Sequence, residues 1–514
     1  MRPFEGPAPL GSPESARRRW TPQQRSLAAL TAIFVASRAV FYAAGIRFDD
    51  SGLGTFYQFL DTDFLRHDLA RSIYHLHAQP PLFNLYLGLV VHLPQSWWHT
   101  AFVLTFAGLG LALIWSMFCL MCEFHVPRPA AFAVTVLFAI APATIVYENF
   151  LFYTYLDATL LVAAGLFLVR FLRSRRTMYG VLTFSLLAAL VLTRSAFHVL
   201  WLALIVGLVW AMGSLGWKKV LAAAAIPFIV ATAWYGKNLA EFGTFSSSTW
   251  LGMNLTRVVF ADRDDPYQLR LVANGTLGSE ALIPAFSPVA KYRGIDTRST
   301  GVPALDRRRM ASGVINFNNQ AYIEISDRYL ADSLTYIRRR PGSYLRNLAK
   351  DVRIAFVPAA QYFGVNRNAQ QISEWQSLYS RWIEGQLHGY QRGVYLFGAP
   401  EAGNVAWTLV LAYGSTIVSG PVLLWLLLRR RVEDRPVALT MLVLSTTVLY
   451  ALVVTSALEQ GENHRFRFDT DPIVWVMTAA LITFAVRKWR GRSAGSATLT
   501  PTADALVDAN PQRD

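Results

Sequence analysis

Ionisable side chains collect at one set of ends of the apolar runs in this sequence, although they come from five separated segments. The set combines carboxylates with cations and histidines: Asp61, Asp63, Glu148, Arg194, His198, Lys237, Glu459, Glu462, His464, Arg465 and Arg467. Arg38 and Asp157 lie deeper, inside apolar runs. A charge at membrane depth costs roughly 2.5–3.5 kcal/mol on insertion scales, so such groups usually face a polar cavity. The pattern therefore predicts one shared cavity rather than a solvated rim.

This mixture of side chains suits the transfer of a group away from a lipid phosphate. A lipid-linked donor keeps its tail in the bilayer and its phosphate at the interface. Arginine and lysine hold a phosphate, and arginine does so by two parallel hydrogen bonds. A carboxylate takes the proton from an attacking hydroxyl, which typically raises the rate by about 10²–10⁴-fold. Cations stabilise the charge that grows on the departing phosphate.

The composition places these residues in a membrane protein. Of the 514 residues, 53% are hydrophobic and 16% are charged, whereas soluble domains carry about 25% charged residues. The formal charge is +15, but the basic residues form short clusters between apolar runs, which indicates membrane topology rather than nucleic-acid binding. Cys119 and Cys122 lie inside an apolar run, which indicates helix packing rather than a metal site or a disulfide.

Ten apolar runs approach the length that crosses a hydrocarbon core, which is about 20 helical residues. They cover residues 27–46, 100–122, 130–147, 150–170, 179–193, 197–214, 218–235, 404–428, 436–457 and 470–487. The run at 80–93 is shorter and is predicted as a surface helix. The predicted fold is an all-α polytopic membrane protein with about ten transmembrane helices, juxtamembrane helices and a mainly helical extracytoplasmic region.

The basic clusters set the orientation, because short loops rich in lysine and arginine stay in the cytoplasm. With both chain ends inside, every short basic cluster falls on the cytoplasmic side. The chain then divides into a disordered cytoplasmic N-terminus (1–26), a transmembrane catalytic module (27–235) with an active-site loop (47–99), an extracytoplasmic region (236–403), C-terminal transmembrane helices (404–487) and a disordered cytoplasmic tail (488–514). The expected location is the cell membrane, with a multi-pass chain and its active site on the extracytoplasmic face.

Five motifs follow one another in an order that is similar to a known family. They are "QPPLF" (79–83), "AIAPATIVYENFLFYTYLDATLL" (139–161), "WYGKNLAEFGTFSSSTWLGMN" (234–254), "YIRRRPGSYLRN" (336–347) and "ENHRFRFDTDPIVWV" (462–476). Together they resemble the GT-C superfamily of membrane glycosyltransferases, especially the protein O-mannosyltransferases and the bacterial aminoarabinose transferase. Lys237 stands where many bacterial members have arginine, and Gln79 stands where the aminoarabinose enzyme has a basic residue.

The resemblance implies transfer of a hexosyl or pentosyl group from a polyprenyl-phosphate donor to an extracytoplasmic glycan, lipid or protein. The expected catalytic residues are Asp61, Glu148 and Asp63, and the expected phosphate-binding residues are Arg194, Lys237, Arg465 and Arg467. Arg38, His77, Gln79, Asp157, His198, Glu462 and His464 are expected to complete the cavity. Asp49 and Asp50 remain alternatives for the first acid, because the spacing from Asp61 to Pro80 is short. The sequence does not identify a cofactor, and a divalent metal ion is one alternative. No nucleic-acid partner is expected.

Two other functions fit a cavity of this kind. A transporter or flippase of lipid-linked sugars uses it without breaking a bond. A non-catalytic envelope-assembly protein keeps the fold and loses the reactive groups. Both acids and a phosphate-binding cation are present, which favours the enzyme.

Overall fold

The computed structural model describes residues 20–261, 265–295, 298–387 and 404–497. Every regular element within these ranges is a helix, and the extended pairings are two isolated bridges, Asp49–Phe150 and Arg309–Ile315. Seven helices are long and apolar enough to cross a membrane. They are α1 (Pro22–Ala43), α5 (Trp98–Glu123), α8 (Tyr153–Ser174), α11 (Trp217–Phe242), α19 (Trp407–Leu428), α20 (Arg435–Leu458) and α22 (Asp471–Ala497). The chain is therefore a polytopic helical membrane protein.

An eighth candidate span is broken. Helices α6 (Arg128–Ala139) and α7 (Pro142–Glu148) are apolar enough together, but they meet at an angle of 59°. Pro142 stands at the break and cannot donate the backbone hydrogen bond that would continue α6. Helices α9 (Thr177–Thr193) and α10 (Val199–Met212) have 17 and 14 residues, fewer than the ~20 that span a core. The count of about ten spans therefore stays a prediction.

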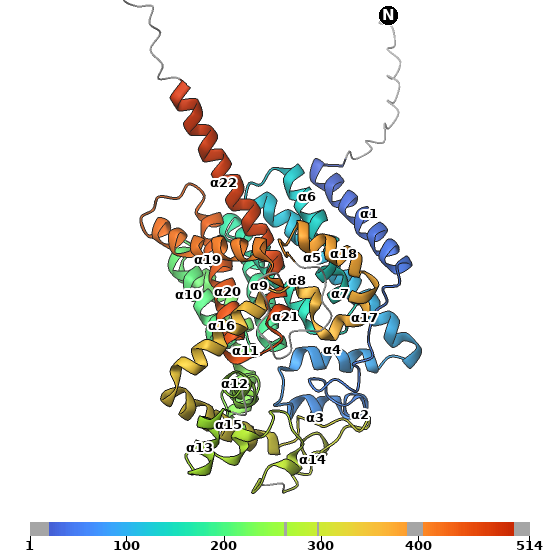
Figure 1. The fold of residues 1–514 in the computed structure, drawn as a ribbon. Coiled ribbons are helices and arrows are strands. Elements are labelled where there is room, and N and C mark those ends of the chain that lie inside the picture. Colours follow the sequence, from blue (N-terminus) through green and yellow to red (C-terminus); the bar gives the residue numbers. More distant parts are fainter. Residues whose placement is uncertain (1–19, 262–264, 296–297, 388–403, 498–514) are drawn as a thin grey trace, which may run out of the picture.

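The helix ends that carry the basic clusters lie together. Arg173 at the end of α8 pairs with Glu123 at the end of α5 and, at 2.7 Å, with Asp434 just before α20. His125 contacts the same Asp434 carboxylate at 2.8 Å. The start of α1 and the end of α22 lie at one end of the bundle, and the helices from α12 (Leu251–Val259) to α15 (Ala321–Arg339) lie at the other (Figure 1). We call these the basic end and the cavity end.

Short helices cover the cavity end. They include α2 (Thr62–His67), α3 (Leu69–Tyr74), α4 (Pro81–Val91), α12 (Leu251–Val259), α13 (Pro266–Ala273) and α14 (Pro303–Asp306), together with the longer α15 (Ala321–Arg339). Helices α16 (Pro341–Ala355) and α21 (Asn463–Phe468) pack on α20. Gly252 allows α12 and α15 to pack closely, because a Cβ atom there would lie 1.8 Å from the Ser326 carbonyl oxygen. Single turns of 3₁₀ helix complete the connections: η1 (Gln95–Trp97), η2 (Ser279–Leu282), η3 (Val289–Lys291), η4 (Ala359–Gln361) and η5 (Phe363–Val365).

Part of the region 236–403 packs on the bundle rather than beyond it. Helices α17 (Asn366–Gln371) and α18 (Ser373–Trp382) contact α7. The Trp375 indole donates a hydrogen bond to the Ile140 carbonyl (2.9 Å), and the Tyr379 hydroxyl donates one to the Leu137 carbonyl (3.1 Å). These carbonyls have no helical partner because α6 ends at the break. Helix α18 therefore completes the hydrogen bonding of the broken span.

The chain ends differ from the predicted boundaries. Helix α1 begins at Pro22 after a Thr21 cap, and α22 continues to Ala497. The predicted disordered segments thus overlap α1 by five residues, 22–26, and α22 by ten residues, 488–497. Residues 1–19 and 498–514 lie outside the described residues, as does 388–403 of the predicted extracytoplasmic region.

Cysteine labelling tests the orientation of the bundle. In a Cys119→Ala, Cys122→Ala background, we expect Thr300→Cys to react with an impermeant maleimide on intact cells. Arg431→Cys should react only after permeabilisation, because it lies in a basic cluster between α19 and α20. Both positions are exposed, so accessibility within the fold does not separate them. The reverse pattern would put the cavity end in the cytoplasm.

Candidate functional site

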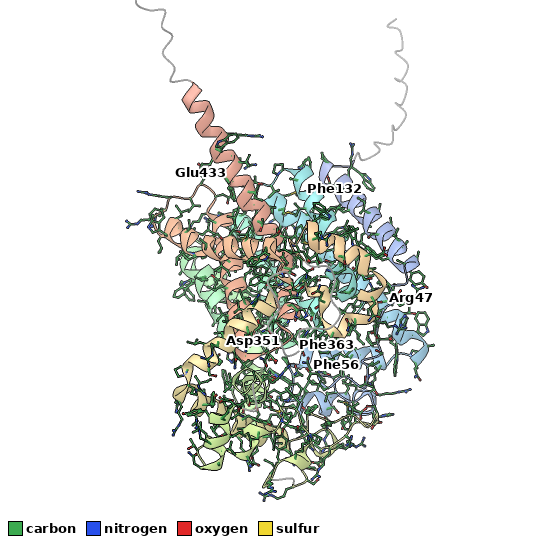
Figure 2. All side chains as sticks on the ribbon, in the orientation of Figure 1. Arg47, Phe56, Phe132, Asp351, Phe363 and Glu433 are labelled. Atoms are coloured by element: carbon green, nitrogen blue, oxygen red, sulfur yellow. The ribbon has the colours of Figure 1, made fainter. Side chains whose placement is uncertain are left out.

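A cavity of about 360 Å³ lies where the bundle meets the short helices of the cavity end. In Figure 2, Phe56, Asp351 and Phe363 are labelled at a similar height, between the bundle and the helices of the cavity end, and none of the three lines the cavity. Residues from the predicted active-site loop, the segment after α9, α12 and the segment after α20 line the cavity. Its charged and polar lining residues include Gln58, Gln79, Arg194, His198, Asn254, Glu459 and Arg465. Four of the sequence-predicted site residues are thus on one cavity: Gln79, Arg194, His198 and Arg465.

The two arginines of the cavity flank one aromatic ring. The guanidinium carbons of Arg194 and Arg465 lie 4.5 and 4.4 Å from the centroid of Phe466. Their exposed fractions are 3% and 1%, so each needs a compensating charge. Arg465 donates two hydrogen bonds to Glu462 Oε2, at 2.6 and 3.0 Å. The arginines are therefore held in fixed positions.

Arg194 is hydrogen-bonded to one aspartate and lies near a second. Arg194 pairs with Asp469, and its Nη1 atom lies 3.7 Å from Asp157 Oδ2. Neither aspartate lines the cavity, and Glu462 does not line it either. Asp157 and Glu462, which were predicted as cavity residues, instead support the arginines that line it.

Glu459 is the one carboxylate among the lining residues of the described part of the chain. It follows directly on α20, and Arg257 of α12 donates a hydrogen bond of 2.8 Å to its Oε2 atom. The side chain keeps 18% of its surface exposed. Burial raises the pKa of Glu459 to about 7, against the opposing charge of Arg257. A carboxylate with this pKa suits proton transfer near neutral pH.

One wall of the cavity is apolar. It is formed by Phe245, Leu251, Val454 and Leu458. Phe245 and Leu251 are 45% and 44% exposed, and they follow α11, whose exposed side is also apolar at Ile229. The arrangement joins a cationic pocket to a surface that suits hydrocarbon.

The predicted first acids lie elsewhere. Asp61 caps α2, accepting a hydrogen bond from the Asp63 amide (3.1 Å), and its second oxygen accepts one from the Ala311 amide (2.6 Å). Asp63 pairs with Arg307 at 2.9 Å on the exposed surface, and this hydrogen bond holds the pKa of Asp63 below its ordinary value. Neither residue lines the cavity, because their oxygens stabilise the loop around residue 311 and the start of α2.

The predicted second acid belongs to a separate buried cluster. Glu148 pairs with Arg38 and accepts a hydrogen bond of 3.0 Å from the Tyr155 hydroxyl. Arg38 also donates to the Ala139 carbonyl, 2.8 Å away at the end of α6. This cluster therefore stabilises the break between α6 and α7, and neither Glu148 nor Arg38 lines the cavity.

Arg465 and Arg467 point in opposite directions, as residues two apart on a helix must. Arg467 lies 3.2 Å from Asp471, and its carbonyl accepts a hydrogen bond from Tyr413 of α19. It does not line the cavity. His464 is buried beside Tyr362, with ring centroids 6.0 Å apart, and burial lowers the pKa of His464 to about 3. Both residues stabilise the packing of α21.

His77 and Lys237 connect the active-site loop to its surroundings. The His77 ring contacts Thr249 Oγ1 at 2.8 Å and the Asn318 carbonyl at 2.9 Å, and burial lowers the pKa of His77 to about 3. The Lys237 ammonium donates to the Leu76 carbonyl at 3.2 Å and lies 3.9 Å from the Trp234 ring centroid. Both fix residues 76–78 next to the cavity without lining it.

The remaining candidates do not form a metal site. Asp49 accepts hydrogen bonds from Ser51, and Asp50 contacts His99 at 2.9 Å. Neither aspartate lines the cavity. In the described ranges, no three His, Cys, Asp or Glu side chains are grouped so that they could hold a metal ion.

Comparison with known proteins does not add to this picture. No protein-family model, curated protein or solved structure matches the chain. The chemistry of the cavity therefore carries the functional argument.

Proposed function

We propose that this protein is a glycosyltransferase that moves a hexosyl or pentosyl group from a polyprenyl-phosphate donor to an acceptor hydroxyl. The observation that carries the proposal is the cavity, which combines Arg194 and Arg465, the carboxylate of Glu459 and an apolar wall. The acceptor is a glycan, lipid or protein at the extracytoplasmic face of the cell membrane. The resemblance to the GT-C superfamily agrees with this proposal.

In this proposal, the donor phosphate binds at Arg194 and Arg465. Arginine presents several N–H donors in one plane, which match two phosphate oxygens. Glu462 and Asp469 keep the guanidinium groups in place before the donor arrives, so little reorganisation is needed when charge develops. The polyprenyl tail leaves along Phe245, Leu251 and Leu458 into the bilayer.

The reaction is a displacement at the anomeric carbon of the sugar. The acceptor oxygen forms a bond to that carbon, and the bond from the carbon to the phosphate oxygen breaks. The phosphate departs with the electron pair as polyprenyl phosphate, next to Arg194 and Arg465. The hydroxyl proton passes to Glu459, which replaces Asp61 as our candidate for the base because it lines the cavity.

The test is transfer by the purified protein in nanodiscs. The donors are polyprenyl phosphates that carry a radiolabelled hexose or pentose, and the acceptor source is an envelope fraction from a strain that lacks the protein. We expect label in the acceptor fraction and an equimolar release of sugar-free polyprenyl phosphate. A transporter or flippase would instead move the intact donor across vesicles without releasing this lipid. A non-catalytic assembly protein would do neither, and either result contradicts the proposal.

A further inference from the structure

Two side-chain amides of the cavity have no hydrogen-bond partner among the described residues. They belong to Gln79 and Asn254, which both line the cavity. Gln79 is only 8% exposed, so its amide has little access to solvent other than through the cavity. Neither amide is sealed off from the cavity, so both groups can form hydrogen bonds with a ligand that fills it.

The backbone holds both amides in place. Gln79 precedes Pro80 and Pro81, and a residue before proline is restricted to extended conformations. Pro80 itself is the N-cap of α4. Asn254 lies in the middle of α12, whose close contact with α15 depends on Gly252. The backbone that carries each amide therefore belongs to a rigid element, and the two elements are far apart in the sequence.

The wall beside these amides is aromatic. Tyr57, Trp250 and Phe286 line the cavity and pack on one another, with the Tyr57 and Trp250 rings stacked at 5.9 Å and Phe286 5.0 Å from Trp250. Rigid aromatic groups bury the apolar C–H faces of a ligand, and amides bind its hydroxyl groups as both donors and acceptors. This combination fits a neutral, hydroxyl-rich ring.

We infer that Gln79 and Asn254 select an uncharged sugar as the group that is transferred. This inference rests on the proposed function and names its sugar class. A cationic amino sugar would add a further positive charge near Arg194, Arg465 and Arg257, where Glu459 is the one lining carboxylate in the described part of the chain. An acidic sugar would compete with the phosphate for Arg194 and Arg465.

Binding to three lipids tests the inference. The probes are sugar-free polyprenyl phosphate, polyprenyl-phosphate mannose and the polyprenyl phosphate of 4-amino-4-deoxyarabinose, each measured by titration of the protein in nanodiscs. We expect the mannose lipid to bind about tenfold more tightly than the amino-sugar lipid. Gln79→Leu and Asn254→Leu should each weaken the binding of the mannose lipid by about three- to tenfold, the range for one lost hydrogen bond. The sugar-free lipid should bind these variants as it binds the unchanged protein.

A matched control is Gln95→Leu, the same substitution at an exposed position in η1, which should change none of the affinities. Equal binding of mannose and amino-sugar lipids, or equal weakening of all three lipids by Gln79→Leu and Asn254→Leu, overturns the inference and leaves the proposed function standing. Failure of the unchanged protein to bind any of the three lipids overturns the proposed function, and the inference with it.

Discussion

Replacing Glu459 with glutamine is expected to slow sugar transfer at least ~100-fold, the lower end of the range for losing a general base. Glutamine keeps the size of the side chain and one oxygen for Arg257, but it cannot accept the hydroxyl proton. Donor binding should stay near that of the unchanged protein, because the phosphate contacts come from Arg194 and Arg465. The measurement is the transfer rate at saturating donor, together with the donor affinity.

The pH dependence of transfer should identify the same group. Glu459 has a pKa raised to about 7, so below that pH it carries a proton and cannot act as a base. The rate should therefore rise as the pH passes through about 7 and level off above it. Arg257→Gln removes the cation that opposes the raised pKa, so the rising limb should move to higher pH. Arg307→Gln, which removes an exposed ion pair with Asp63, should not change the pH at which the transfer rate rises.

Asp61→Asn is the comparison that decides between the two candidate bases. Asparagine caps helices as well as aspartate does, so α2 should stay formed, and we expect a rate within about threefold of the unchanged protein. If Asp61→Asn slowed sugar transfer 100-fold and Glu459→Gln did not, the base would be Asp61, as the family resemblance implies. The cavity would then have to extend to α2 when the donor binds.

The membrane elements were predictable because apolar length is a local property. The runs at 100–122, 218–235 and 436–457 lie within long helices of the structure, and most of each run at 150–170, 404–428 and 470–487 does so as well. The packing of α18 against the break between α6 and α7 was not predictable in this way. It depends on hydrogen bonds from Trp375 and Tyr379 to carbonyls of α6 and its end, more than 200 residues earlier in the chain. The hydrophobic periodicity of neither segment predicts these contacts.

The site was predictable in part, for a similar reason. Position at the end of an apolar run identified Arg194, His198 and Arg465, which all line one cavity, but it does not say which way a side chain points. Asp61 accepts a hydrogen bond from the Ala311 amide, 250 residues away, and Glu148 forms an ion pair with Arg38 of α1. Glu459 was also predicted among the ionisable residues at the ends of apolar runs, but no catalytic or binding role was assigned to it. The signal that singles it out is its Arg257 partner on α12, which sequence spacing does not reveal.

Arg465→Lys should weaken donor binding and lower transfer by about 10²-fold, the lower range for loss of one preorganised charge contact in a reaction site. Lysine keeps a positive charge opposite Glu462, so the carboxylate is not left uncompensated, which would cost about 3–5 kcal/mol. What lysine loses is the planar pair of donors that fits a phosphate. The measurements are the affinity for sugar-free polyprenyl phosphate and the transfer rate, with thermal unfolding as a check on the fold.

Arg467→Lys provides the matched comparison, because it makes the same change two residues later on the same helix. Arg467 contacts Asp471 rather than the cavity, so its replacement should leave lipid affinity within about twofold even if the melting temperature falls. The sequence alone assigns both arginines to the phosphate, whereas the helix geometry separates them by about 200°. Equal losses of affinity in the two variants would contradict the separation. They would mean that α21 turns, or that the donor reaches both faces of it, and the phosphate site would then have to include Arg467.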